Sequence, residues 1–320
     1  MQERIFANVS KAIAAVIKNE MAISEPEETT DIETVRARIV EKAQNLVLHL
    51  KPPGKKSELS QEYLNLKAKL KQLLERGPLA RFSFEELENL FFMLAQVARY
   101  EGILMLENEG FLAQVQPVAG AEEELFHLGL SLILNGAEPR LVEATLNTRA
   151  QALLHHLSTR YQMIAEGLTA IRAGSYPGFI DLNLRNFYIS VRQGDGEYTE
   201  NPVAALKEKL QEKPFAHFTL DEVTQFVLDL SVAVRKEGPS ILADLAEQVD
   251  DELLGWGLEA MQMLEGNIEP KLVQRLIEIQ ARTLQYRHDT RYQMISEGLR
   301  SIQNGENPRI IAQKLKCFYA

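Results

Sequence analysis

Repetition within the sequence limits what this chain can fold into. The run Arg160-Tyr-Gln-Met-Ile-Ala-Glu-Gly-Leu168 returns as Arg291-Tyr-Gln-Met-Ile-Ser-Glu-Gly-Leu299. Two shorter pairs precede it: Phe82-Ser-Phe-Glu-Glu-Leu87 with Phe218-Thr-Leu-Asp-Glu-Val223, and Arg99-Tyr-Glu-Gly102 with Arg235-Lys-Glu-Gly238. Because the three blocks keep one order in both occurrences, they indicate a duplicated structural unit.

The repeated blocks have the patterns of helix starts and helix interiors. Two pairs have the spacing of capping boxes, Ser83 with Glu86 and Thr219 with Glu222. The segments 85–107 and 221–249 carry apolar residues at helical spacing and are predicted helices. Pro239 should break or kink the second, because proline lacks an amide hydrogen and crowds the preceding turn. The two units are therefore expected to differ in shape at this point.

Glycine–proline pairs punctuate the helical stretches. A glycine stands three or four residues before a proline in four places, Gly136/Pro139, Gly174/Pro177, Gly266/Pro270 and Gly305/Pro308. Glycine suits the left-handed residue that ends a helix, and proline suits the first turn of the next. Strand patterns are scarce, since β-branched alternation over five or more residues does not occur. The sequence predicts an all-α protein of tandem duplicated multi-helix domains with helix-turn-helix corners.

The same signals divide the chain. Residues 1–60 are predicted to form an N-terminal helical extension, residues 61–192 the first unit and residues 201–320 the second. Each unit is long enough for its own hydrophobic core.

Charge and cysteine content restrict partners and compartment. The chain has 45 acidic and 35 basic residues, a net charge of −10, which disfavours nucleic acid and anionic membranes. Apolar stretches fall short of the ~20 residues that cross a bilayer, and Lys11 interrupts the apolar N-terminal run, unlike a signal peptide. The single cysteine, Cys317, fits a reducing compartment. We expect a cytoplasmic protein with no membrane insertion.

No residue constellation in the sequence points to catalysis, a metal or a cofactor. The histidines form no His-Glu-x-x-His pair, and no phosphate loop or nucleophile elbow occurs. His127, His155 and Trp256 lie in apolar helical patterns and are expected to pack in the core. The carboxylate runs 121–125 and 248–252 are expected to be solvated helix starts, which the helix dipole favours. The chain is predicted not to be an enzyme and to bind no cofactor.

Four segments share a further pattern, namely Ala95–Glu107, Leu128–Pro139, Glu166–Pro177 and Glu297–Arg309. The first carries Ala-Arg-x-x-Gly followed by Leu and Glu, and the others carry Gly-Leu before a Gly-x-x-Pro corner. In this order they resemble the cytoplasmic region of MotA-type flagellar motor stator proteins. The resemblance covers roughly residues 65–190 and 205–320.

The resemblance implies binding to the flagellar rotor through charged side chains. Arg99 and Glu107 match the charged positions of the family, and Arg235 matches the arginine in the second unit, where Ala243 takes the glutamate position. The family's membrane spans have no counterpart in this sequence, so ion-driven torque is not implied.

Two functions stay open. One is a non-enzymatic module that mediates protein–protein interaction, with a flagellar rotor or stator component or with a second copy of itself, through Arg99, Glu107 and Arg235. The alternative is a general helical scaffold or adaptor with no motor role.

Overall fold

The computed structural model describes residues 56–104, 106, 120–189, 201–263 and 270–320. Its contacts divide the chain into two units, Met1–Asn65 and Leu66–Ala320, and nearly all of the described residues belong to the second. The described residues form eleven α-helices and two 3₁₀ helices, with no strand among them. This confirms the predicted all-α class. Most of the predicted extension 1–60 lies outside the described residues.

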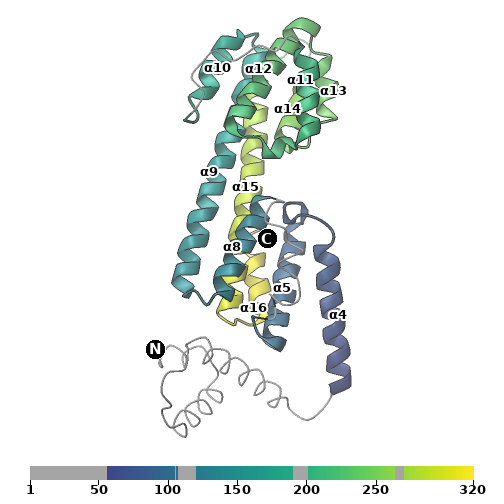
Figure 1. The fold of residues 1–320 in the computed structure, drawn as a ribbon, viewed down its shortest axis with the longest axis vertical. Coiled ribbons are helices and arrows are strands. Elements are labelled where there is room, and N and C mark those ends of the chain that lie inside the picture. The colour runs from purple at the N-terminus through teal and green to yellow at the C-terminus, as the bar shows by residue number, and fades with distance from the viewer. Residues whose placement is uncertain (1–55, 105, 107–119, 190–200, 264–269) are drawn as a thin grey trace, which may run out of the picture. The chain divides into compact units, whose positions relative to one another are not determined.

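Figure 1 shows the helices of the described residues in chain order. Those of the first half of the sequence are α4 (Lys56–Leu74), η1 (Leu79–Arg81), α5 (Phe84–Glu101), α8 (Ala121–Leu134), α9 (Pro139–Arg172) and α10 (Pro177–Arg185). Those of the second half are α11 (Pro202–Glu212), η2 (Phe215–His217), α12 (Leu220–Glu237), α13 (Ile241–Ala246), α14 (Glu252–Met263), α15 (Pro270–Gln303) and α16 (Pro308–Lys316).

Both predicted capping boxes form. The Ser83 hydroxyl accepts a hydrogen bond from the Glu86 amide, and the Glu86 carboxylate accepts one from the Ser83 amide. Thr219 and Glu222 make the same reciprocal pair at the start of α12. Each box satisfies two amide donors that a helix start would otherwise leave unpaired.

The predicted helix ends are partly corrected. α5 ends at Glu101 rather than at residue 107, because Gly102 takes a φ of 94° that leaves the helical region. α12 ends at Glu237 before Gly238, with a φ of 85°, so the helix does break beside Pro239 as expected. The two units were expected to differ in shape here because only the second has a proline. For the helix ends this expectation is wrong, since α5 and α12 both stop at a glycine.

The glycine–proline pairs lie between helices. Gly136, Gly174 and Gly305 have positive φ, and Pro139, Pro177 and Pro308 begin the helices that follow. Gly266 lies outside the described residues.

Two long antiparallel helices organise the unit Leu66–Ala320. α9 and α15 have 34 residues each and lie side by side (Figure 1). Glu143 near the start of α9 pairs with Arg300 near the end of α15. The start of α9 and the end of α15 pack with η1, α5, α8 and α16, which we call the α5 lobe. The other ends pack with η2 and α10–α14, which we call the α12 lobe.

Each lobe contains helices from both halves of the sequence. In the α5 lobe, α5 packs against α16 and the end of α15. In the α12 lobe, α12 packs against α10 and the end of α9, and the core there joins Leu168 and Leu184 to Phe226 and Leu258. The predicted units 61–192 and 201–320 thus exchange their final helices, and neither forms a lobe core alone.

Close crossings at four glycines hold the exchanged helices. Gly129 packs on Leu299, Gly257 on Leu168, Gly298 on Phe91 and Gly167 on Val227, and at each glycine a Cβ would lie within 3.0 Å of that neighbour. Real Cβ contacts are not that short, so a larger residue would require the neighbour to shift. The terminal methyl groups of Leu299 and Leu168 can shift more readily than the Phe91 ring. Both glycines of the repeated Glu-Gly-Leu block therefore serve contacts between the two halves.

We predict that Gly298→Ala destabilises the protein. The new Cβ would lie 2.5 Å from Cγ and 2.7 Å from Cε1 of Phe91, a ring that is fully buried and cannot move aside. Overpacking of this kind costs about 1–3 kcal/mol, which outweighs the ~1 kcal/mol that alanine gains over glycine inside a helix. The free energy of unfolding by urea measures the change.

Gly255→Ala is the matched control. Gly255 also lies inside a helix, but the nearest atoms to its Cβ would be the Ala246 and Val249 carbonyl oxygens at 4.0 Å. This variant should be as stable as the wild type or more so. Equal loss of stability in both variants would contradict the tight crossing at Phe91.

Candidate functional site

The arginines of the repeated Arg-Tyr-Gln-Met-Ile block are buried structural residues. Arg160 of α9 donates hydrogen bonds to the carbonyl oxygens of Phe215 and Ala216, both at 2.5 Å, and to Asp251 at 3.1 Å. Arg291 of α15 donates to the Phe82 carbonyl oxygen at 3.2 Å. Each arginine thus reaches the other half of the sequence and donates hydrogen bonds to carbonyl groups at a 3₁₀ turn, which would otherwise be buried without a donor.

The carboxylates at the start of α8 are not solvated as expected. Glu122 and Glu123 are only 2% and 1% exposed. Glu123 accepts a hydrogen bond from the Leu79 amide, and Glu122 Oε1 lies 2.8 Å from His288 Nδ1. They are buried because η1 and α15 pack over this helix start and supply the donors. Burial raises the pKa of Glu123, whose Oε2 has no hydrogen-bond partner among the described residues.

In the α12 lobe, two aspartates accept hydrogen bonds as Glu122 and Glu123 do in the α5 lobe. Asp250 accepts a hydrogen bond from the Phe215 amide at 2.8 Å, and Asp251 pairs with Arg160. The expectation of a fully solvated run therefore fails here too for Asp251, whose side chain is 8% exposed.

The aromatic residues predicted to pack in the core have different outcomes. His127 is half-buried, its Nε2 is buried, and burial lowers its pKa. Trp256 is half-buried against the core of the α12 lobe. His155 is exposed, which corrects the prediction, because the middle of α9 lies outside both lobe cores.

The predicted partner-binding arginines lie at matching places. Arg99 is exposed in the last turn of α5, beside a hollow of about 380 Å³ formed with Tyr100 and with the start of α16 at Asn307. Arg235 is exposed in the last turn of α12 and donates to the Gly174 carbonyl oxygen at 2.5 Å. Glu107 lies outside the described residues.

A group of exposed apolar side chains on α10 begins beside Arg235. Its guanidinium lies 5.9 Å from the centre of the Tyr176 ring, and Tyr176 meets Phe179 edge-on at 6.4 Å. Tyr176, Phe179 and Leu182 are 59%, 67% and 62% exposed. We call these four residues the Arg235 patch. No separate sequence signal marks it, because apolar residues at helical spacing on α10 also fit a core-facing helix.

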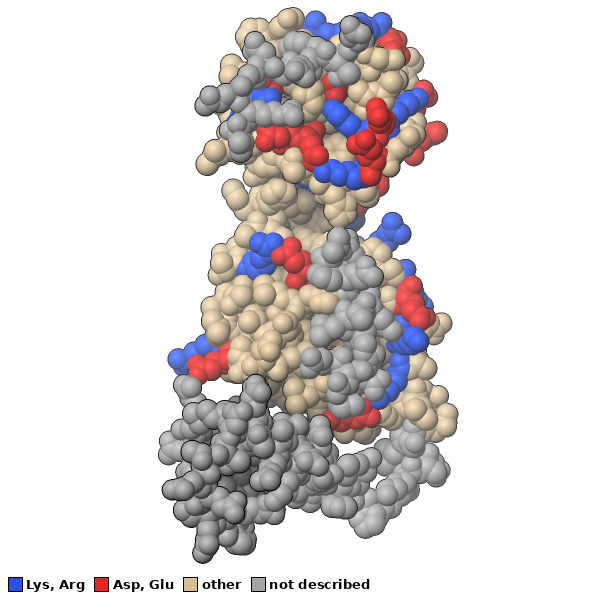
Figure 2. Space-filling model, in the orientation of Figure 1, with Lys and Arg blue, Asp and Glu red and all other residues tan. Residues whose placement is uncertain are grey.

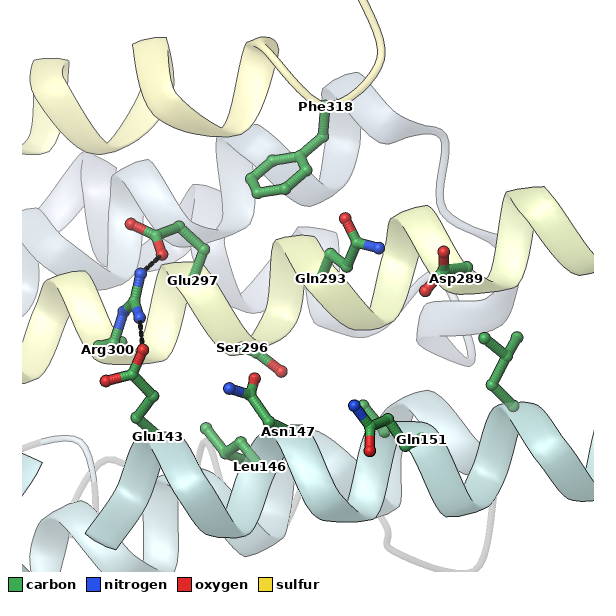
Figure 3. A pocket seen from close by; sticks show the side chains of 12 residues that line it. Glu143, Leu146, Asn147, Gln151, Asp289, Gln293, Ser296, Glu297, Arg300 and Phe318 are labelled. Atoms are coloured by element: carbon green, nitrogen blue, oxygen red, sulfur yellow. Dashed lines mark hydrogen bonds and ion pairs between the residues drawn. The ribbon is translucent and has the colours of Figure 1, made fainter. Parts of the chain in front are cut away.

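A cleft of about 300 Å³ lies between the start of α9 and the end of α15 (Figure 3). Arg300 is held there between Glu143 and Glu297, and Lys314 binds Glu297 at 3.1 Å. Phe318, which follows α16, also lines the cleft. The Glu143–Arg300 pair joins α9 to α15, and Glu297 binds the same arginine from within α15.

A second cleft of about 340 Å³ lies between the other ends of α9 and α15. Its lining includes Glu166 and Phe187, which correspond in the repeat to Glu297 and Phe318. Neither cleft is lined by a histidine or cysteine.

Within the described part of the chain, no three His, Cys, Asp or Glu side chains come together as a metal site. Within the same residues, no helix has the length and apolarity needed to cross a membrane. No protein-family model matches this sequence, and no curated protein matches it.

We predict that Glu123 makes stability depend on pH. Its pKa is raised in the folded protein, so the unfolded chain releases this proton at lower pH than the folded chain. Stability from this group is present below the ordinary glutamate pKa of about 4.3 and is lost as pH rises through the raised value. Urea unfolding across that pH range should show wild-type stability declining relative to Glu123→Gln.

Glu85→Gln, at an exposed position in the first turn of α5, is the control. The stability difference between this variant and the wild type should show no such decline. A flat difference for Glu123→Gln as well would contradict a buried, desolvated Glu123.

Proposed function

We propose that this chain is a non-enzymatic, cytoplasmic protein-binding module, composed of two copies of a helical unit that resembles the cytoplasmic region of MotA-type stator proteins. The observation that carries the proposal is the Arg235 patch, where three large apolar side chains are each more than half exposed and one of them, Tyr176, lies beside the arginine.

The composition of this patch is that of a binding hot spot. Aromatic residues and arginine are enriched at the energetically important centres of protein interfaces. Tyr176 and Phe179 each have few rotatable bonds, so they lose little conformational entropy when a partner covers them. Exposed contiguous apolar surface of this kind marks interaction sites on soluble proteins.

Equivalent elements in the two halves support the duplication and its corners. The order η1, α5, α8, α9, α10 is matched by η2, α12, α14, α15, α16. Arg99 and Arg235 lie beside equivalent turns, α15–α16 and α9–α10. The duplicated module therefore presents two related surfaces, of which the Arg235 patch is the more apolar.

The choice of partner follows from charge and from the family resemblance. On the face shown in Figure 2, basic and acidic side chains of the α12 lobe are interspersed rather than gathered into a basic field. A net charge of −10 also disfavours nucleic acid. The matched order of stator-like blocks favours a flagellar rotor or stator component as the protein partner.

Substitutions in the patch should abolish capture of that partner. We predict that Phe179→Asp and Arg235→Glu each weaken binding about tenfold or more, as expected at a hot spot, and that Arg99→Glu weakens it if the partner spans both lobes. The measurement is capture by the full chain from a lysate of a flagellated bacterium, with partners identified by mass spectrometry and their affinities then determined.

Glu208→Arg is the control, because this exposed residue of α11 lies in the same lobe but outside the patch. It reverses a charge as Arg235→Glu does and should leave capture unchanged. Capture that is insensitive to Phe179→Asp, Arg235→Glu and Arg99→Glu alike would contradict the proposal. Specific capture of proteins unrelated to the motor would favour the scaffold alternative.

A further inference from the structure

An exposed apolar stripe follows the first half of α15. Leu272, Leu276, Ile279 and Tyr286 are 49%, 36%, 51% and 66% exposed, and Thr283 is exposed between them. We call these five residues the α15 stripe. The helix also has a separate buried face, where Val273, Ile277 and Leu284 pack into the α12 lobe. The stripe is thus additional to the face that anchors the helix.

The stripe has the spacing of a coiled-coil seam. Its residues follow one another at intervals of four, three, four and three, which is the alternation of d and a positions in heptads. A second helix with the same spacing could therefore pack along two heptads of α15, with its apolar side chains between those of the stripe.

The fold itself does not require the stripe. α9 has the same length and the mirrored role in the other lobe, and counting from the proline that begins each helix makes its positions comparable. Leu141, itself 56% exposed, occupies the place of Leu272, whereas Thr145, Thr148 and His155 occupy the places of Leu276, Ile279 and Tyr286. Because α9 functions as a lobe-spanning helix with polar residues at three of these places, the apolar residues Leu276, Ile279 and Tyr286 on α15 need another explanation.

Basic residues flank the stripe on one side. Arg275 and Arg282 each precede a stripe residue and stand at g positions, and both are exposed. Arg282 lies 3.9 Å from Glu278, a contact too long for a strong bond, with its own side chain 80% exposed. Lys271 is exposed on the same side, and α9 has Ala144 and Gln151 at the matching places of the two arginines. Arginines at g positions favour carboxylates on the partner helix.

On the opposite side of the stripe, the charged residue Arg287 is already paired. Arg287 is bound by both carboxylate oxygens of Glu252, each at 2.9 Å. The g positions beside the stripe are therefore basic, and their two arginines are exposed.

The same arginines disfavour a second copy of this chain as the occupant. Two α15 stripes packed antiparallel would bring the g positions of both helices together, so arginine would face arginine. Packed in parallel, Arg282 would face Arg287 of the second copy. Like charges across a seam weaken association in either direction.

We therefore propose that the α15 stripe binds an acidic amphipathic helix of a partner protein. This inference rests on the proposed protein-binding function and names a second surface and the chemistry of what it binds. The partner helix supplies apolar residues at heptad spacing and glutamate or aspartate beside them, opposite Arg275 and Arg282.

Two synthetic peptides test the proposal with the full chain. Both have three heptads with Leu at a and d. One has Glu at every e and g position and the other has Lys, so each repels its own copies and stays monomeric. Fluorescence anisotropy should show the Glu peptide binding at least tenfold tighter than the Lys peptide, with the preference reduced at high salt.

Three variants locate the binding. Ile279→Glu should weaken binding of the Glu peptide at least tenfold. Thr148→Glu, the matching substitution on α9, should leave the affinity for this peptide unchanged. The double variant Arg275→Glu with Arg282→Glu should reverse the preference in favour of the Lys peptide. A reversed preference cannot arise from misfolding, so it keeps the test decisive even if one variant is unstable.

Several results would overturn the proposal. Equal binding of the two peptides, or binding that Ile279→Glu does not affect, would show that the stripe does not bind an acidic helix. Self-association that Ile279→Glu abolishes would make a second copy the occupant. Cosedimentation with phosphatidylserine vesicles that Ile279→Glu abolishes would make a membrane the occupant. If the peptides fail while Phe179→Asp still abolishes capture of a protein partner, the α15 proposal is wrong and the protein-binding function stands.

Discussion

The fold depends on each long helix crossing closely over a helix from the other half of the sequence. Gly167 and Gly298 allow α9 and α15 to approach Val227 and Phe91 without a Cβ between them. Because this contact is made between the two halves of the sequence, each lobe core forms only when both halves contribute. The middle of α9, including the exposed His155, lies outside both cores.

Burial of charge follows from the same exchange. Arg160 and Arg291 each reach a 3₁₀ turn of the other half of the sequence, where carbonyl groups accept their hydrogen bonds. The arginines and backbone amides in turn require acceptors, which Asp251 and Glu123 supply. Removing one partner from such a set leaves another buried and unpaired, at a cost larger than the pair contributes on its own. Surface residues are not constrained by these contacts and can differ between the lobes. The exposed apolar residues of α10 and α15 are such differences.

Local features of the fold could be predicted from the sequence, and features set by distant contacts could not. The capping boxes and the break at Pro239 depend on neighbouring residues, and the structure has both. The burial of Glu122 could not be foreseen, because a helix start rich in acids is solvated unless a remote segment covers it. Arg99 and Arg235 emerged as candidates only through a family resemblance. Phe179 was missed because helical spacing does not reveal which apolar face stays uncovered.

Cleavage between the two halves tests the exchange most directly. Cleavage at a protease site placed between residues 192 and 201 of the full chain would separate α10 from α11. We predict that the two fragments stay associated and elute together in size-exclusion chromatography, with helical content and thermal unfolding like those of the intact chain. Fragments that separate into two folded monomers would contradict shared cores and would indicate two independent domains.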